Sequence, residues 1–184
     1  MRFSGRLTPE QFWAHVSSME DQVRAQAHLL PLYGLAQWDG PRMVGDWGTA
    51  NGELTTVGLY HGEPDDGPRV HVMVDTRDPG DPVQERRMSA VDHEADRDAV
   101  MAALDRAASP ATATVTISVD GNPEIFDHWV DGTTWYAARQ HGEHALVIEA
   151  HDVSPDDVAV VRVDDVEPYL AGRRAWIRHK RGED

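Results

Sequence analysis

The most constraining feature of this sequence is a series of four strand-like segments in its second half. Residues 112–119, 124–130, 133–141 and 144–152 alternate apolar and polar side chains, which is typical of strands with two different faces. Short pairs that contain glycine separate them, namely Gly121-Asn122, Asp131-Gly132 and Gly142-Glu143. Asp-Gly between alternating segments favours a type I′ hairpin turn. The sequence therefore predicts a four-stranded antiparallel meander.

Two-residue turns also predict how the four strands pair. Counting outward from the three turns places Thr116 opposite Asp127, Asp127 opposite Tyr136, and Tyr136 opposite Glu149. Because side chains alternate between the faces of a strand, one face of this sheet is largely apolar. We expect it to be the core face, with Val115, Ile117, Phe126, His128, Trp135, Ala137, Leu146 and Ile148.

The opposite face of the meander carries the leading candidate ligand-binding site. Two carboxylates beside a phenol bind a cation or a polar ligand, and in an enclosed site like charges raise one carboxyl pKa and create an acid–base pair. The alternative is a solvated sheet face on which such residues are simply good strand formers. The candidate residues are Thr116, Asp127, Trp129, Tyr136, Glu149 and His151.

A pair of histidines is a weaker candidate. His141 and His144 flank the Gly142-Glu143 turn, so their imidazoles come within cross-strand distance. A zinc site needs three or four ligands, and the sequence places no third one. No metal site and no cofactor are predicted, and solvated histidines at a hairpin tip are the alternative.

The rest of the chain reads as helices, one further hairpin and loops. Thr8-Pro9-Glu10-Gln11 is a capping box that starts a helix running to about Leu29, with an apolar stripe at Phe12, Val16, Met19 and Val23. The other expected elements are a loop at 31–52, a hairpin at 54–61 and 69–76, a polar loop at 77–92, a helix at 93–108 with Val100, Met101 and Leu104 inward, a strand at 159–163, a helix after Asp164, and a frayed tail at 178–184.

The expected loop at 31–52 contains three large aromatic residues. Tyr33, Trp38 and Trp47 are either core residues or an exposed patch that contacts a partner. Aromatic side chains in loops are enriched at binding surfaces, so the second role makes this a candidate interaction loop.

Composition narrows the functional classes. The chain has 32 acidic and 17 basic residues among 184, a formal charge of −15, which repels nucleic acid and attracts basic partners, although solubility alone also explains it. It has no cysteine, which fits a cytoplasmic protein. No apolar segment approaches the roughly 20 residues of a membrane span, and the N-terminus lacks the apolar core of a secretory signal.

These features predict one α+β domain over residues 1–184. We expect two layers: an antiparallel sheet of about six strands, packed by the N-terminal and central helices. The element order resembles the cone-shaped rolls of the nuclear-transport-factor-2 type. No motif supports that resemblance, so it implies no residue role or activity.

Two functional hypotheses remain open. The first is a non-enzymatic binding or accessory protein that acts on a basic protein partner. The second is a small enzyme or small-ligand-binding roll with a carboxylate–tyrosine pocket on the polar sheet face. The sequence contains no nucleophile elbow, P-loop, dinucleotide-binding motif or zinc-protease motif to select a reaction. Oligomeric state is not determined by these features.

Overall fold

The computed structural model describes residues 8–64, 66–76, 87, 96–111 and 113–183. The described residues form three α-helices and two short 3₁₀ helices beside one sheet. The helices are α1 (Pro9–Gln26), η1 (Ala27–Leu29), α3 (Arg97–Ala107), η2 (Pro155–Asp157) and α4 (Glu167–Arg181). The strands are β1 (Tyr33–Leu35), β2 (Arg42–Ala50), β3 (Glu53–Glu63), β4 (Asp66–Asp75), β5 (Ala113–Val119), β6 (Asn122–Asp131), β7 (Thr134–His141), β8 (His144–His151) and β9 (Ala159–Arg162).

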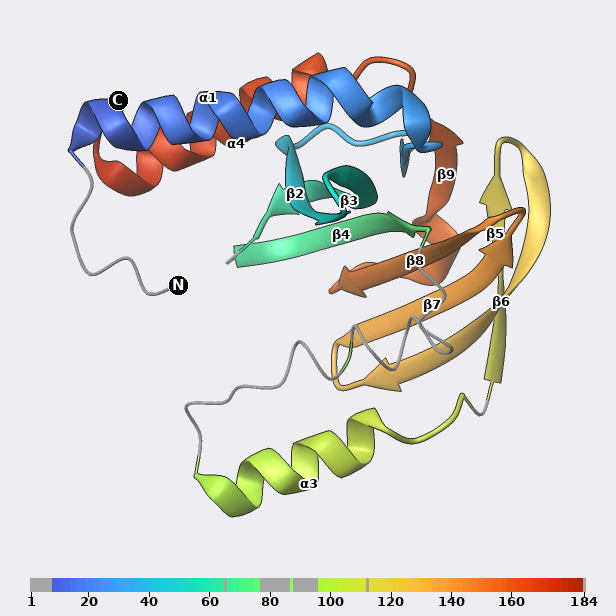
Figure 1. Ribbon diagram of the computed structural model, residues 1–184. Helices are drawn as coiled ribbons and strands as arrows, with labels where there is room; N and C mark the ends of the chain where they lie inside the picture. The colour runs from blue at the N-terminus through green and yellow to red at the C-terminus, as the bar shows by residue number, and fades with distance from the viewer. Residues whose placement is uncertain (1–7, 65, 77–86, 88–95, 112, 184) are drawn as a thin grey trace.

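The prediction of a two-layer domain with about six antiparallel strands is wrong. The nine described strands form one mixed sheet in the order β1-β9-β5-β6-β7-β8-β4-β3-β2, in which β5 and β9 are parallel. The sheet curls into a half-barrel (Figure 1). Two of the additional strands, β1 and β2, lie in the segment expected to be a loop. Register shifts in β2 after Val44 and after Gly48 interrupt the period of two by which a strand is recognised.

The four strands of the predicted meander are present, and the prediction for one of its three turns is confirmed in full. Gly142 has a φ of 63° and occupies the first position of a two-residue loop, so Tyr136 lies opposite Glu149. A glycine with positive φ at this position is the signature of a type II′ turn.

The other two turns are displaced by two residues from the prediction. Gly132, with a φ of 62°, takes the first loop position and Tyr136 lies opposite Trp129 instead of Asp127. Asp120 and Gly121, with φ of 50° and 81°, form the turn before β6, and Thr116 lies opposite Ile125. Because the displacement is an even number, each side chain keeps its predicted face.

The predicted apolar face of the meander lines the inside of the curl. Of the residues predicted there, Val115 packs at the margin of the core and His128 is only half-buried. The buried core inside the curl consists of Tyr33, Leu35, Val70, Val72, Val74, Ile117, Val119, Phe126, Trp135, Ala137, Leu146, Ile148, Ala150, Val158 and Val160. β4 and β8 are adjacent antiparallel strands, so this core joins the first hairpin to the meander.

α1 and α4 lie side by side over β2 and β3 (Figure 1). α1 begins with the predicted capping box, in which Thr8 and Gln11 each accept the other's backbone N–H. A second core fills the space between these helices and the strands, with Val23, Leu30, Leu32, Val44, Leu54, Val57, Leu59, Val166, Tyr169 and Leu170.

α4 also covers the edge strand β2. A Cβ on Gly172 would lie 1.8 Å from the carbonyl oxygen of Arg42, so the close approach requires glycine. Arg173 Nη1 donates to the carbonyl oxygens of Val44 and Gly45, at 2.9 and 2.6 Å. These contacts occupy backbone acceptors that an exposed edge would offer to another chain.

The segment 178–184, expected to fray, is helical through Arg181. Gly182, with a φ of 64°, ends the helix in the left-handed conformation typical of a C-terminal cap. The Arg178 guanidinium lies 5.6 Å from the ring centroid of Trp13, and that of Arg181 lies 4.2 Å from that of Phe12. Cation–π contacts therefore attach the end of α4 to the start of α1.

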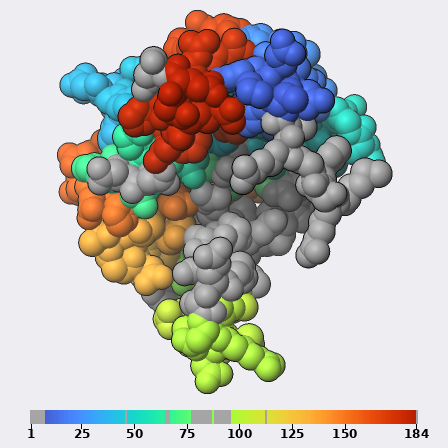
Figure 2. Space-filling view, turned by 90° about the vertical axis from the view of Figure 1, so that its left-hand side faces the viewer, coloured from blue at the N-terminus to red at the C-terminus, as the bar shows by residue number. Residues whose placement is uncertain are grey.

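α3 does not cover the sheet as predicted for the central helix. It projects from the far end of the molecule (Figure 2), Ala107 is its one buried residue, and Met101 is 51% exposed. The prediction that Met101 points inward is therefore wrong. Among the described helices, none is long and apolar enough to cross a membrane.

Candidate functional site

The structure does not bring the six predicted ligand-binding residues together. Thr116 and Asp127 are exposed, and neither lies opposite Tyr136. Half-buried His151 accepts or donates through Nδ1 to the Thr134 hydroxyl at 2.9 Å. The predicted row therefore keeps the pairing of Tyr136 with Glu149 and loses the other two, because two of its three turns are displaced.

A different polar row crosses the outer face of the curl. It follows five adjacent strands in direct register: Trp129, Tyr136, Glu149, His71 and Tyr60. Tyr136, Glu149 and Trp129 were predicted to belong to the site. His71 and Tyr60 were missed, because the first hairpin joins the meander only through the pairing of β4 with β8.

The two additional members of this outer row are stacked. The rings of Tyr60 and His71 are 4.0 Å apart between centroids and 6° from parallel. Two glycines provide the space, since a Cβ on Gly58 would meet His71 at 1.9 Å and one on Gly45 would meet Tyr60 at 2.0 Å. The stack therefore depends on a backbone that carries no side chain beneath either ring.

Much of the outer row is buried although it is polar. His71, Tyr136 and the neighbouring Asp75 are 2%, 7% and 2% exposed, while Glu149 is half-buried. The apolar residues beside them are Met73, Ala138 and Val147, with Trp129 at the margin. A buried polar row of this kind fixes the pairing of the strands, which is a structural role.

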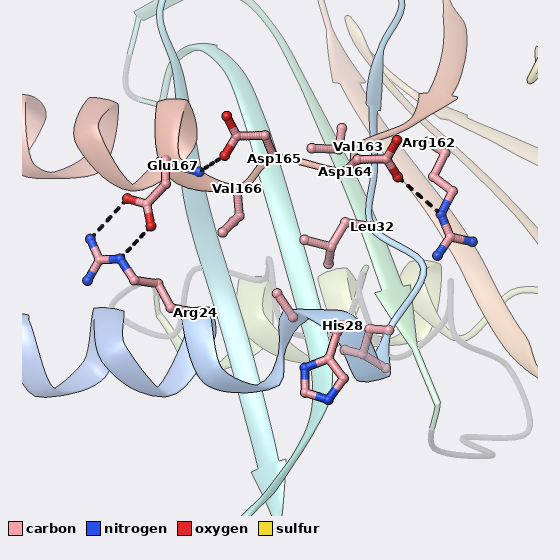
Figure 3. A pocket seen from close by; sticks show the side chains of 11 residues that line it. Arg24, His28, Leu32, Arg162, Val163, Asp164, Asp165, Val166 and Glu167 are labelled. Carbon is pink, nitrogen blue, oxygen red and sulfur yellow. Dashed lines mark hydrogen bonds and ion pairs between the residues drawn. The ribbon is translucent and has the colours of Figure 1, made fainter.

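A groove on another side of the molecule is the better candidate for a binding site. It consists of two adjoining pockets of about 380 and 400 Å³ that share His28, Leu30 and Arg162. In the first pocket, Arg24 Nε of α1 binds Glu167 Oε1 of α4 at 2.6 Å, and Arg162 Nε lies 3.7 Å from Asp164 Oδ1 (Figure 3). The arginines and acids of this half already face one another.

Two side chains that line the second pocket, Tyr33 and His141, form a hydrogen-bonded chain with Glu124. The Tyr33 hydroxyl lies 3.1 Å from His141 Nε2, and His141 Nδ1 lies 3.2 Å from Glu124 Oε2. Tyr33 comes from β1, His141 from the end of β7 and Glu124 from β6. β6 and β7 are consecutive strands, and β1, which is distant from them in sequence, meets them here.

The chemistry of the three groups determines where the protons lie. An ionised carboxylate only accepts, so Nδ1 of His141 carries the proton shared with Glu124. Nε2 of the neutral ring then accepts from the Tyr33 hydroxyl. Glu124 Oε2 also accepts from Arg139 Nη1 at 2.8 Å. We call Tyr33, His141 and Glu124 the relay.

Tyr33 is the buried member of the relay. Burial raises the pKa of its phenol, and the nearby Asp120 carboxylate raises it further. Tyr33 therefore retains its proton at neutral pH. Asp120 also accepts the backbone N–H of Arg162 at 2.8 Å, which attaches the turn before β6 to β9.

Histidines are concentrated in the second pocket. His28 of η1, His141 and His144 line it together with Arg162, Glu143 and the apolar residues Leu29, Leu30 and Pro31. Nδ1 of His144 is shielded from solvent and has no hydrogen-bond partner among the described residues. In the part of the chain that the structure describes, no three histidine or acidic side chains are placed to hold a metal ion.

The three aromatic residues of the predicted interaction loop are packed within the fold. Tyr33 is in the relay, and half-buried Trp38 packs against the inner core with its ring 6.2 Å from that of His61. Trp47 packs against the second core, under the Arg173 guanidinium at 4.6 Å. Their positions favour a core role over an exposed patch.

Comparisons with known proteins give no relative. No protein-family model matches the chain, and no curated protein or solved structure is significantly similar to it.

Proposed function

We propose that this protein binds a small molecule in the groove between η1, β9 and the β7–β8 turn. The observation that carries the proposal is the relay, which presents a buried phenol to a pocket of about 400 Å³. Buried polar groups that converge on a concave surface with an apolar wall are the usual composition of a ligand site. The apolar wall here is formed by Leu29, Leu30 and Pro31.

This proposal retains the hypothesis of a ligand-binding site but places the site elsewhere in the molecule. The sequence placed the pocket on the polar face of the meander, around Asp127, Tyr136 and Glu149. The groove instead uses residues from both ends of the chain, and of the predicted candidates it contains Tyr33. The proposal requires binding alone.

Fragment binding with a blocked-groove variant tests the proposal. Leu29→Trp fills the groove from an exposed position, and Met101→Trp on α3 is the matched control because both side chains are 51% exposed. Screening by thermal shift and by amide NMR is expected to find fragments that stabilise the protein and move the resonances of Gly142, His144 and Arg162. Leu29→Trp should abolish these effects and Met101→Trp should preserve them. Hits that respond equally to both variants would contradict the proposal.

A basic protein partner is the second candidate function. Several arginines take part in ion pairs, hydrogen bonds or cation–π contacts with other residues of the chain, including Arg24, Arg139, Arg173, Arg174, Arg178 and Arg181. Acids such as Asp164 and Asp21, with side chains 93% and 73% exposed, remain at the surface. The surplus negative charge is therefore available to a cationic partner. A cytoplasmic location, which the cysteine-free composition favours, belongs to the same proposal.

Calorimetry with a small cationic protein such as cytochrome c tests this second candidate. Charge-driven binding should be measurable at low salt and weaken steeply as salt is added. A pair of substitutions, Asp21→Asn and Asp164→Asn, should weaken it further. Binding that is insensitive to salt and to both substitutions would exclude an electrostatic partner surface.

A further inference from the structure

We propose that the ligand of the groove carries an anionic group, a carboxylate or a phosphate, and that the relay tightens its binding when His141 gains a proton. This inference rests on the proposed function and specifies its ligand class. It follows from which donors and acceptors around the second pocket are already occupied.

The acids near the pocket have partners within the fold. Glu124 accepts from Arg139 Nη1 at 2.8 Å and interacts with His141. Asp120 accepts the backbone N–H of Arg162. Among the described carboxylates that line or adjoin the pocket, Glu143 at the exposed hairpin tip has no partner assigned.

Several donors, in contrast, keep unused capacity. Arg162 Nε is 3.7 Å from Asp164, beyond hydrogen-bond distance, and the Arg162 side chain is 56% exposed. His144 and the exposed His28 line the same pocket. An arginine and imidazoles around an apolar wall are suited to an anionic group attached to an apolar body. This is a local excess of donors in a chain whose net charge is −15.

The relay supplies a donor whose direction depends on protonation. While His141 is neutral, the Tyr33 O–H is donated to Nε2 and is not available to a ligand. When Nε2 gains a proton, the His141 N–H donates to the Tyr33 oxygen, and the hydroxyl proton is released for another acceptor, either a ligand oxygen in the pocket or the Asp120 carboxylate, which already interacts with this hydroxyl. One proton is taken up at Nε2, and Tyr33 keeps its own. Anion binding and protonation of His141 therefore favour each other.

Other charged groups around His141 act together with the relay. The groups that face it from the neighbouring elements are His28 of η1, Tyr33 of β1, Asp120 of the β5–β6 turn, Glu124 of β6, Arg139 of β7, Glu143 and His144 of the β7–β8 hairpin, and Arg162 of β9. His28 and His144 are further imidazoles that, in their protonated forms, attract an anion without the relay. A test must separate the relay from this general effect.

Four probes that share one ring identify the charge that the groove prefers. Benzoate, phenyl phosphate, benzamide and benzylamine differ in the group attached to the ring, and their dissociation constants are measured by amide NMR at about pH 6 and about pH 8. We expect benzoate or phenyl phosphate to bind more tightly than benzamide, and benzylamine least tightly. The ratio between benzoate and phenyl phosphate distinguishes a carboxylate ligand from a phosphate ligand.

Three variants connect the preference to the named residues. Arg162→Gln should weaken benzoate binding by roughly tenfold, the loss of one charge-assisted hydrogen bond. Arg106→Gln on α3 is the control and should leave the dissociation constant unchanged. Tyr33→Phe keeps the buried ring but removes the hydroxyl. It should lose part of the increase in affinity between about pH 8 and about pH 6, whereas the part due to His28 and His144 remains.

The outcomes separate this inference from the proposed function. If benzamide or benzylamine binds the groove as tightly as benzoate, the anion inference is wrong and the groove remains a ligand site. If no probe and no screened fragment moves the groove resonances, both the anion inference and the proposed function are wrong. If benzoate is preferred but Tyr33→Phe keeps the full pH dependence, the relay has no part in binding.

Discussion

The two helical regions of this protein differ sharply in how they are attached to the sheet. α1 and α4 cover β2 and β3 with a shared core that includes Leu170 and Val23, which are 1% and 0% exposed. α3 has an apolar stripe as well, yet Met101 in it is 51% exposed. An amphipathic sequence therefore shows which face of a helix can be buried. Whether the face is buried depends on a partner surface elsewhere in the chain.

The two regions also differ in their polar contacts. The α1–α4 pair has cation–π contacts at one end, such as Arg178 with Trp13, and ion pairs toward the other, such as Arg24 with Glu167. α3 is attached at its C-terminal end, where Arg87 donates to the carbonyl oxygen of Arg106 at 2.6 Å. The α1–α4 pair is therefore held along its length, whereas α3 is held at one end.

Removing one leucine from each region gives the largest expected difference. Leu170→Ala leaves a cavity in a closed core and should lower the free energy of unfolding by about 3 kcal/mol. Leu104→Ala in α3 should cost less than about 1 kcal/mol, because this side chain is only partly buried. Urea denaturation followed by circular dichroism measures both. Equal losses would show that α3 is packed as firmly as the pair.

The buried carboxylate of the helix pair gives the next largest effect. Glu20 is 1% exposed and receives hydrogen bonds from Arg174, whose Nε lies 3.3 Å from Oε1. Arg174→Met should lower the free energy of unfolding by about 2 kcal/mol, because it leaves the buried Glu20 carboxylate without its main partner. The cost is smaller than for a fully buried pair, since the Arg174 side chain is 39% exposed.

The double variant Glu20→Leu with Arg174→Met is the control for this ion pair. Removing both charges should restore most of the lost stability, because an apolar pair needs no compensation for desolvation. A double variant as unstable as Arg174→Met alone would show that the arginine acts through packing.

A pH effect on the helix pair is the smallest of the three. His61 is fully buried against Tyr169 of α4, and burial lowers its pKa to about 4. The folded state therefore resists a proton that the unfolded state accepts at its ordinary pKa of about 6.5, so stability falls as pH drops below that value. Between about pH 8 and about pH 5.5 the loss from His61 should be about 1.4 kcal/mol.

A comparison of two variants shows which histidine causes that pH effect. His61→Gln keeps an acceptor near the backbone N–H of Leu35, which His61 Nε2 binds at 3.0 Å, and it should remove this part of the pH dependence. Burial also lowers the pKa of His128, whose partner on β5 is Ala113, near the α3 end. If His128→Gln flattens the curve and His61→Gln does not, the acid-sensitive site lies at the α3 end of the molecule.

The meander shows how far the sequence constrains a sheet. Alternation predicted which side chains share a face, and the inner core confirms it at Ile117, Phe126 and Ile148. The pairing was wrong at two turns because glycine was placed second in the loop at Asp131-Gly132 and first at Gly121-Asn122. A displacement by two residues leaves alternation unchanged, so the hydrophobic pattern cannot detect it. Positive φ at Asp120 and at Gly132 decides it.

The candidate groove was less accessible to prediction than the sheet. Tyr33 was singled out as a possible contact with a partner. His141 and His144 were singled out as a possible metal-binding pair. Nothing local in the sequence connects Tyr33 to His141, which is 108 residues away. Their contact requires β1 to pair with β9, and β9 to reach β5 by a short parallel ladder at Ser118 and Val119.

The sequence by itself determined the local features of this protein: the capping box at Thr8, the four strands of the meander and the face on which each of their side chains lies. These follow from backbone preference and from the period of two, which act over a few residues. The tertiary structure decided the curl of the sheet, the covered edge at Gly172, the exposed α3 and the meeting of Tyr33, His141 and Glu124. Each of these depends on which distant strands pair, and that choice is made by the burial of whole faces against one another.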